Sequence, residues 1–377
     1  MAGIYIHIPF CKQACYYCDF YFSTSQRLKG DFIESLLKEW KKEQGYLGTE
    51  TIQSIYFGGG TPSLLKSDEI SRILEAIYQS ANVAEGAEIT LEANPDDLTP
   101  QKVKEISATA INRLSIGVQS FFDEDLKWMN RAHSSAEAIQ SIQTAQDAGL
   151  NNITIDLIYG VPGMSLSRWQ ENLGHFYDLS LPHLSAYSLT VEQNTPLYKL
   201  IKQGSYTTTD DALSASHFDE LMQQMKQAGF LHYEISNFAT DEQHIARHNS
   251  SYWKGVKYLG LGPSAHSFDL NSRRWNVASL QKYIDGTGHG EVVYATEQLS
   301  ERDRFNEYIL TGLRTMWGVD VTKLTEKFSQ DLVEYFLKDI QKYIDEGKVF
   351  EEGNCYVLSE TGKLYADAIA SDLFFLD

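Results

Sequence analysis

Three of the four cysteines in the chain lie close together near its amino end, with the spacing C-x3-C-x2-C: Cys11, Cys15 and Cys18. They follow an apolar run that predicts a strand, so we expect them on the loop at its carboxyl end. Three thiolates at this spacing could hold three corners of an iron–sulfur cube. Because such clusters normally have four cysteine ligands, a trio would leave one iron open to another ligand. The spacing therefore predicts a [4Fe–4S] cluster with one open iron.

Zinc is the main alternative for these thiols, since it also binds three or four sulfur atoms. Its usual signature needs a second pair of Cys or His residues, and Cys355 stands alone far along the chain. His7 could complete such a site, but in a strand of alternating pattern it fits equally well as a wall residue. Thiols without a function are the last alternative, and three of them this close by chance would be unusual.

Glycines and polar side chains follow the other predicted strands, at the ends where barrels of strand–helix units carry their active sites. Three consecutive glycines, 58–60, in "FGGGTP" would let a ligand approach the backbone closely. Arg131 could pair with a carboxylate. Each polar group alone could equally be a hydrogen-bonding or helix-capping residue, but together they predict a site for one polar ligand. Those at the ends of three further strands are Glu92, Gln119 and Asp156.

The elements that would position these residues alternate between strand and helix through the first half of the chain. Apolar runs predict strands at residues 4–8, 52–57, 88–92, 113–118, 152–158 and 183–189. Amphipathic helices lie between them; pairs of capping type, Asp31 with Glu34 and Ser134 with Glu137, mark two of their starts. Six such units predict an α/β fold with a parallel sheet, a partial (β/α)6 barrel. An open doubly wound sheet is the alternative that periodicity does not exclude.

The pattern changes after residue 190. Residues 191–299 are expected to extend the barrel and to contribute to the pocket, with a helix at 211–229, a strand in "HYEISNFA" and a loop rich in glycine and aromatic residues from His248. Residues 300–377 predict a C-terminal, mainly helical, winged-helix-like domain. Its hairpin should turn at Gly353 and Asn354, and its last helix should start at Lys363. Residues 1–190 are then the barrel core.

Composition excludes several classes of protein. The 377 residues carry a formal net charge of −19, which speaks against generic binding of nucleic acids. No apolar run is long enough to span a bilayer, no signal peptide opens the chain, and the cysteines do not form a secreted disulfide framework. We therefore expect a cytoplasmic protein. Peripheral membrane contact and a homodimer stay open.

Four motifs in this order resemble the radical S-adenosylmethionine (SAM) family of oxygen-independent coproporphyrinogen III oxidase: "YIHIPFCKQACYYCDF", "YFGGGTPS", "RLSIGVQSF" and "IDLIYGVPG". The resemblance runs through the whole chain. It implies a radical SAM partial barrel in which Cys11, Cys15 and Cys18 hold the cluster, and SAM binds the open iron. Tyr17 would meet the adenine of SAM through its ring or backbone. The other positions that match SAM contacts of the family are Tyr5, Gly59, Gly60, Thr61, Glu92, Gln119, Arg131 and Asp156.

Within that family the chain resembles the HemW group, heme chaperones that deliver heme to respiratory enzymes. The oxidase has an extra segment before its cysteines and a fourth cysteine at the position of Phe20, and we expect neither here. The HemW group also carries an H-N-x-x-Y-W motif, which this chain has at 248–253. An imidazole can ligate heme iron. The resemblance thus implies a heme site formed by His248, Tyr252 and Trp253.

Other histidines and functions are less clearly marked. His266 is expected to line the same cavity, whereas His7 and His133 are expected to be structural. The alternative function is that of the oxidase itself, in which a radical derived from SAM would start decarboxylation of a porphyrinogen. A scaffold that holds a cluster for redox or structural purposes is a third hypothesis. The sequence therefore leaves open whether the chain is an enzyme.

Overall fold

The computed structural model describes residues 1–376, and its main feature is one curved sheet of twelve strands. The first six strands lie side by side in chain order, and all are parallel. This order confirms the partial barrel, because a doubly wound sheet would change direction partway along the strand order. The bounds are β1 Ala2–Ile8, β2 Ile52–Gly59, β3 Val83–Ala93, β4 Arg113–Gln119, β5 Ile153–Tyr159 and β6 His183–Ser188.

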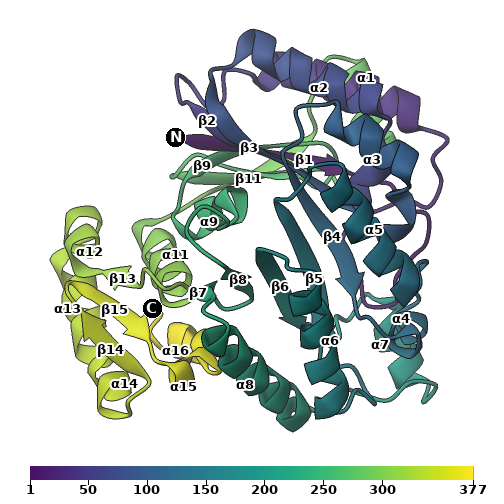
Figure 1. The fold of residues 1–377 in the computed structure, drawn as a ribbon. Coiled ribbons are helices and arrows are strands. Elements are labelled where there is room, and N and C mark those ends of the chain that lie inside the picture. Colours follow the sequence, from purple (N-terminus) through teal and green to yellow (C-terminus); the bar gives the residue numbers. More distant parts are fainter. Residues whose placement is uncertain (377) are drawn as a thin grey trace.

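Successive side chains of each strand point to opposite faces of the sheet, which gives the sheet an apolar outer face and a polar inner face. In β1, Ile4, Ile6 and Ile8 are fully buried against the outer helices, while Tyr5 and His7 point to the barrel interior. Figure 1 shows helices of the first half along the outer side of the strands. These helices are α1 Lys29–Glu43, α2 Ser67–Ser80, α3 Pro100–Ser107, α4 Asp123–Trp128, α5 Ser135–Asp147 and α6 Leu166–Asp178, with short turns η1 Pro62–Leu64 and η2 Pro95–Asp97.

The two predicted capping pairs behave differently. Ser134 and Glu137 form the expected capping box at the start of α5. The prediction that Asp31 and Glu34 form a capping pair was wrong. Helix α1 begins at Lys29 without a side-chain cap, and Glu34 forms an ion pair with Arg72 of α2 instead. An interhelical ion pair that crosses between α1 and α2 is not visible in the local sequence.

The sheet continues beyond both edges of the six parallel strands. At one edge β9 Lys257–Leu261 pairs parallel to β1, and three antiparallel strands follow it; at the other edge β6 pairs with a short hairpin. The loop expected from His248 is therefore wrong: the segment contains a helix that packs on β1 and β2, the strand β9 that pairs with β1, and a further strand that pairs with β9. These added elements are β7 Leu231–Glu234, β8 Asn237–Ala239, α9 Arg247–Trp253, β10 His266–Phe268, β11 Ser272–Asn276 and β12 Tyr294–Gln298.

Helices α7 Pro196–Lys202 and α8 Asp211–Gln227 lie between β6 and β7, and α10 Leu280–Gly288 lies between β11 and β12. Inside the fold, α10 packs on α1 through the buried carboxylate of Glu39. That carboxylate accepts hydrogen bonds from the Tyr283 hydroxyl, the Asn276 amide and the backbone N–H of Gly262. None of the described helices is both long enough and apolar enough to cross a membrane.

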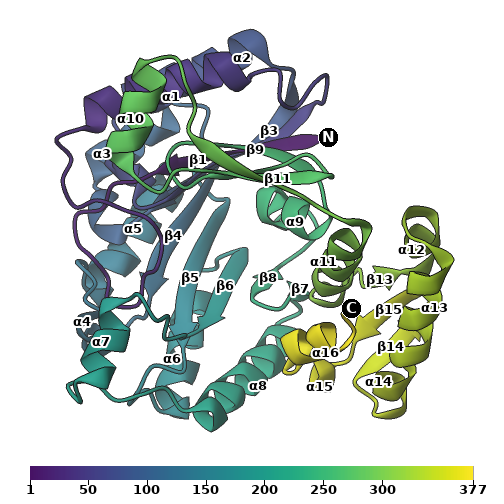
Figure 2. The ribbon, with the colours of Figure 1, turned by 180° about the vertical axis from the view of Figure 1, so that it is seen from behind.

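The C-terminal lobe has its own apolar core, which includes Phe305, Ile309 and Phe336. Its hairpin turns at Gly353 and Asn354, as predicted. Figure 2 shows this lobe beside α8, and backbone hydrogen bonds tie the segment after α11 Glu301–Leu313 to β7 and its turn. The elements of the lobe are α11 Glu301–Leu313, β13 Val319–Asp320, α12 Val321–Lys327, α13 Gln330–Asp339, α14 Gln341–Asp345, β14 Val349–Glu352, β15 Cys355–Leu358, α15 Glu360–Lys363 and α16 Ala366–Asp372.

Candidate functional site

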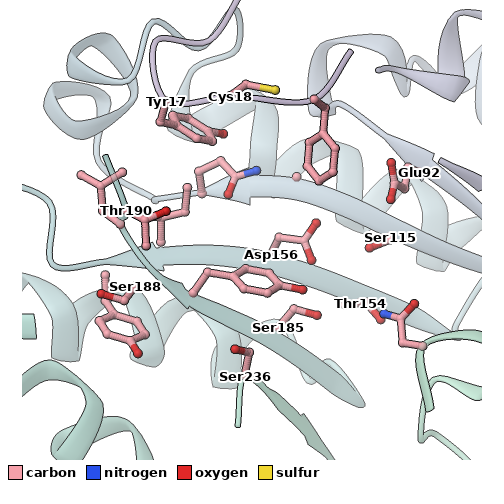
Figure 3. A pocket seen from close by; sticks show the side chains of 18 of the residues that line it. Tyr17, Cys18, Glu92, Ser115, Thr154, Asp156, Ser185, Ser188, Thr190 and Ser236 are labelled. Carbon is pink, nitrogen blue, oxygen red and sulfur yellow. The ribbon is translucent and has the colours of Figure 1, made fainter. Parts of the chain in front are cut away.

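A cavity of about 980 Å³ lies inside the barrel. The loop after β1 borders it on one side, the inner faces of β3 to β6 form its wall, and α8 and the C-terminal lobe border it on the other side. Figure 3 shows Tyr17 and Cys18 on the loop, facing the strands that carry Asp156, Ser115 and Ser185. The cavity therefore joins parts of the chain that are far apart in sequence.

All three clustered cysteines line this cavity as free thiols. The Thr61 hydroxyl donates to Cys11 Sγ over 3.5 Å, and Arg131 Nη1 donates to Cys15 Sγ over 3.2 Å. Burial raises the pKa of the Cys18 thiol to about 12, with Cys15 and Cys11 adding to the rise and a backbone hydrogen bond from Phe20 opposing it. A bound metal cation would reverse this preference for the neutral thiol, because it stabilises the thiolate.

The geometry around the cysteines bears on which metal group could fit. Within residues 1–376, no three His, Cys, Asp or Glu side chains are arranged as ligands of a single metal ion. A cluster of several irons takes its thiolates at separate corners, and hydrogen-bond donors near the sulfurs tune its reduction potential. Thr61 and Arg131 are such donors. The site thus offers a cluster three thiols and two donors, and Cys355 lies away from it on β15 of the C-terminal lobe.

Glu92 stands at the end of β3 and is held from two sides. It accepts from the Tyr56 hydroxyl over 2.7 Å and from the backbone N–H of Gly59 over 3.1 Å. Burial raises its pKa to about 7, and these two hydrogen bonds oppose the rise. At near-neutral pH this carboxyl can therefore either accept or donate a hydrogen bond to a polar ligand.

Asp156 lies on the inner face of β5, with Ser185 and Ser115 as hydrogen-bond partners from the neighbouring strands (Figure 3). Burial is the main cause that raises its pKa to about 7, and the charge of Glu92 adds to it. Two buried carboxyls in one cavity repel each other when both are ionised, so a cationic or hydroxyl-rich ligand would be favoured between them.

The glycines at the end of β2 border the cavity and also make room for packing within the chain. A Cβ atom at Gly60 would lie 2.7 Å from the carbonyl oxygen of Phe10, and one at Gly59 would lie 2.5 Å from the His7 ring. Gly59 also has a φ of +107°, which other residues rarely adopt. These glycines let the loop after β1 pack on the end of β2. They make room first for atoms of the protein itself.

Arg131 is fixed beside the cysteines. Its Nη2 donates to Asn94 Oδ1 and to the carbonyl oxygen of Gly117, each over 2.7 Å, and its buried Nε has no partner among the described residues. Gln119 ends β4 with a φ of +69°, a conformation that is strained for a residue other than glycine. Both side chains line the cavity.

Eight of the nine residues predicted to contact SAM line the cavity; Tyr5 does not. The Tyr5 ring lies deeper in the barrel, stacked on Tyr56 at 6.1 Å between centroids, with its hydroxyl 3.3 Å from His7 Nδ1. Its side chain is part of the aromatic packing below the cavity. The eight are Tyr17, Gly59, Gly60, Thr61, Glu92, Gln119, Arg131 and Asp156.

The predicted heme residues do not meet in one open site. His248 is only 1% exposed, and both its ring nitrogens are engaged: Nδ1 with the Ser54 hydroxyl at 2.9 Å and Nε2 with the Tyr252 hydroxyl at 2.8 Å. Burial lowers its pKa to about 3. None of His248, Tyr252 and Trp253 borders the cavity. To bind iron, the His248 ring would have to give up one of these bonds.

Two other contacts of the H-N-x-x-Y-W segment do reach the cavity. Asn249 lines it directly, and the Trp253 ring lies under the guanidinium of Arg314, 5.3 Å from centroid to Cζ. Arg314, which pairs with Asp367, and Lys363 border the cavity from the C-terminal lobe. Sequence reasoning missed these cations, because nothing near them in the sequence shows that the lobe folds back on the barrel.

The remaining histidines occupy structural positions. His7 Nε2 lies 2.9 Å from the carbonyl oxygen of Tyr21, and His133 Nε2 lies 3.0 Å from that of Val118. The expectation that His266 lines the cavity was wrong: it lies on β10, beyond β9, with its ring stacked on Trp275.

Residues 5–174 match the model of the Radical SAM superfamily, and residues 299–365 match that of the HemN C-terminal domain. The chain is 31% identical over 373 residues to the heme chaperone HemW of Bacillus subtilis, which covers 98% of each chain. It is 32% identical over 360 residues to that of Lactococcus lactis, 95% of this chain and 93% of the relative.

Among solved structures, coproporphyrinogen III oxidase (HemN) from Escherichia coli, a radical SAM enzyme, matches with a TM-score of 0.83. That match covers 99% of this chain and 90% of the other at 20% sequence identity. At this identity the match shows a shared fold and does not by itself assign a function.

Proposed function

The chain belongs to the HemW family of heme chaperones within the radical SAM superfamily, and from this premise we propose that it binds heme and delivers it to respiratory enzymes. It would do so carrying a [4Fe–4S] cluster and SAM. The proposal places the protein in the cytoplasm, with heme and heme-receiving respiratory proteins as partners.

The residues around the cavity suit both resident groups. Cys11, Cys15 and Cys18 would hold the cluster, which supplies an electron and an open iron when it is bound. Glu92 and Asp156 would accept hydrogen bonds from hydroxyl or ammonium groups of SAM, and the loop with Tyr17 would cover its adenine. Arg131 would stabilise the thiolate of Cys15 through its existing contact.

The observation that supports a second, larger ligand is the extent of the cavity. It continues past the predicted SAM residues to β6, α8 and the C-terminal lobe, and its volume of about 980 Å³ is at the upper end for a small-molecule site. The added walls carry apolar and aromatic side chains, Phe218 and Tyr187 among them, and two cations. A flat apolar macrocycle with carboxylates fits such a lining.

In this proposal the H-N-x-x-Y-W segment positions other residues of the heme site instead of ligating the heme iron. His248 and Tyr252 anchor α9 to the barrel, Asn249 borders the cavity, and Trp253 supports Arg314. Arg314 can then pair with a heme carboxylate. Direct ligation of iron by His248 remains the alternative within the same function, and it requires the ring to leave Ser54 or Tyr252.

The shared fold favours one second candidate, the oxygen-independent coproporphyrinogen III oxidase. It would use the same cavity for a porphyrinogen instead of heme. Phe20, at the position of the fourth cysteine of the oxidase, lines the cavity and is 65% exposed, so no thiol is available there. The two functions differ in product and can be separated on one sample.

The test is anaerobic reconstitution with iron and sulfide, followed by titration with heme and by a coproporphyrinogen assay with SAM and reductant. We expect a stable Soret band with heme and no decarboxylated porphyrin. Rapid formation of protoporphyrinogen would instead assign the oxidase activity.

Cysteine variants test the cluster independently. Cys15→Ala should lose the cluster absorbance and the bound iron, and Cys355→Ala should retain both. An iron content that depends on Cys355, or zinc in place of iron in wild-type protein, would contradict the predicted ligand set.

A further inference from the structure

The deep end of the cavity contains a buried arginine that the proposed function does not use. Arg113 opens β4 and is 2% exposed, yet it borders the cavity. Thr154 and His183, at the amino ends of β5 and β6, border the cavity beside it. The clustered cysteines follow the carboxyl end of β1, so this layer lies at the opposite end of the parallel strands.

Every hydrogen-bond acceptor of Arg113 is neutral. Nη1 donates to Asn152 Oδ1 over 2.8 Å and to the carbonyl oxygen of His244 over 3.3 Å, and Nη2 donates to the Thr154 hydroxyl. These bonds use three of the five N–H donors of a guanidinium. Within residues 1–376, Arg113 has no carboxylate in ion-pair contact. A buried cation without a counter-charge is costly, so its presence beside a cavity needs a reason.

The buried carboxylates of the neighbouring strand β3 are held by other groups. Glu88 accepts from the backbone N–H groups of Arg247 and His248, each over 2.9 Å, and Glu92 is held by Tyr56 and Gly59. His183 is no second cation, because burial and the charge of Arg113 lower its pKa well below the ordinary value. The layer therefore carries one positive charge.

The hydroxyl of Thr90, in the same layer, lacks a hydrogen-bond partner within residues 1–376. Thr90 is paired in register with Arg113 across β3 and β4, is fully buried, and borders the cavity. Its hydroxyl has no hydrogen-bond partner among the described residues. A buried, unpartnered hydroxyl on the residue paired in register with Arg113 adds a second donor that lacks an acceptor. A carboxylate oxygen is the acceptor that meets both requirements, charge and hydrogen bonding.

We propose that Arg113 and Thr90 bind a carboxylate of the ligand that occupies the cavity, and this inference rests on the proposed function in naming that carboxylate as a propionate of heme. The carboxylate accepts from the free N–H groups of Arg113 and from the Thr90 hydroxyl. The same chemistry would also hold a small free carboxylate, so the experiment separates the two sources.

The experiment titrates the reconstituted full-length protein with heme and with heme dimethyl ester, which lacks both negative charges. Wild-type protein should bind heme more tightly than the ester. Arg113→Gln should weaken heme binding about ten- to a hundredfold, the usual effect of losing a hydrogen bond to a charged group, and leave ester binding unchanged. Arg72→Gln is the control, because Arg72 pairs with a carboxylate, that of Glu34, on the surface and does not border the cavity.

Thr90→Val keeps the test decisive if Arg113→Gln folds poorly. Valine has nearly the shape of threonine, and the Thr90 hydroxyl has no partner to lose. This variant should keep the cluster content and unfolding midpoint of wild type, and weaken heme binding about fivefold with no change for the ester. Equal heme affinity for wild type, Arg113→Gln and Thr90→Val would overturn the carboxylate site while leaving the heme chaperone proposal intact.

Absence of heme binding by wild-type protein would be a failure of the proposed function, and sodium propionate then decides on the site. Thermal stabilisation of wild type by propionate that disappears in Arg113→Gln would support an anion site for a small carboxylate. Equal thermal shifts in both proteins would overturn it.

Discussion

At the scale of single residues, burial governs the chemistry of the cavity more than contacts between neighbours do. Glu92 and Asp156 each have hydrogen-bond donors that favour the ionised form, and burial still raises the pKa of both to about 7. The same effect keeps His183, which also borders the cavity, neutral. The cavity therefore holds acids that can be protonated and bases that stay unprotonated near neutral pH, until a cofactor or ligand arrives.

The raised pKa values predict how stability depends on pH in protein without cluster or SAM. Because the folded pKa lies above the unfolded value, the native state holds protons that the unfolded chain releases. The stability from Glu92 is then present below about pH 4.5 and is lost as pH rises through about 7. Glu92→Gln should remove this loss. The difference in free energy of unfolding between the variant and wild type should therefore rise by roughly 1–3 kcal/mol, in favour of the variant, between pH 5 and 8.

Urea unfolding at several pH values measures that difference. The comparison must be with the variant, since buried histidines such as His7, whose pKa is lowered to about 4, change stability in the opposite direction. Glu124→Gln, at an exposed carboxylate, should follow the wild-type profile. Parallel pH profiles for wild type and Glu92→Gln would show that Glu92 ionises normally in the folded protein.

At the scale of elements, α9 shows how a short helix can be positioned by the barrel. The helix has seven residues and no side-chain cap from its own N-cap residue. Instead Glu88 of β3 accepts its first two N–H groups, and His248 bonds to Ser54 of β2. These contacts place Asn249 at the cavity and Trp253 under Arg314. The helix depends on the strands beneath it.

Removing this anchor should cost stability. Glu88→Ala leaves one buried and one partly buried N–H group without an acceptor, which should lower the free energy of unfolding by about 2–4 kcal/mol. Glu85→Ala, at an exposed position of the same strand, is the matched control and should change it by less than about 0.5 kcal/mol. Denaturant midpoints measure both, and equal midpoints would mean that the amides find other partners.

At the scale of the whole molecule, the C-terminal lobe contributes to the cavity as well as lying beside the barrel (Figure 1). It places Arg314 and Lys363 at the cavity border of a protein with a net charge of −19. A heme carboxylate approaching such a protein is repelled overall, so local cations at the cavity border matter for the rate of encounter. The lobe provides them.

Arg314→Gln should therefore slow heme association several-fold at low ionic strength, with a smaller effect in high salt because the Debye length falls to about 3 Å at 1 M. Stopped-flow mixing with heme measures the rate. Arg304→Gln in the same lobe is the control, since Arg304 bonds to Asn271 and does not border the cavity. An association rate unchanged by Arg314→Gln at all salt concentrations would place heme entry elsewhere.

The sequence alone determined the features that neighbouring residues encode. Apolar runs predicted all six parallel strands, although β3 begins earlier than expected, at Val83, because its first residues are not apolar in pattern. Ser134 and Glu137 predicted a helix start, and Gly353 with Asn354 predicted the C-terminal turn. The cysteine spacing predicted which thiols share one loop. Each of these depends on contacts within a few residues.

Only the tertiary structure decided which distant residues share the cavity. Nothing near Arg314 or Lys363 indicates that they border it, and the start of a strand at Arg113 gives no sign of a buried cation. The segment after His248 was expected to be a loop, yet it forms α9 and β9 by packing on and pairing with the first strands. Burial and long-range pairing depend on the whole folded chain, because the partners that supply them lie hundreds of residues apart.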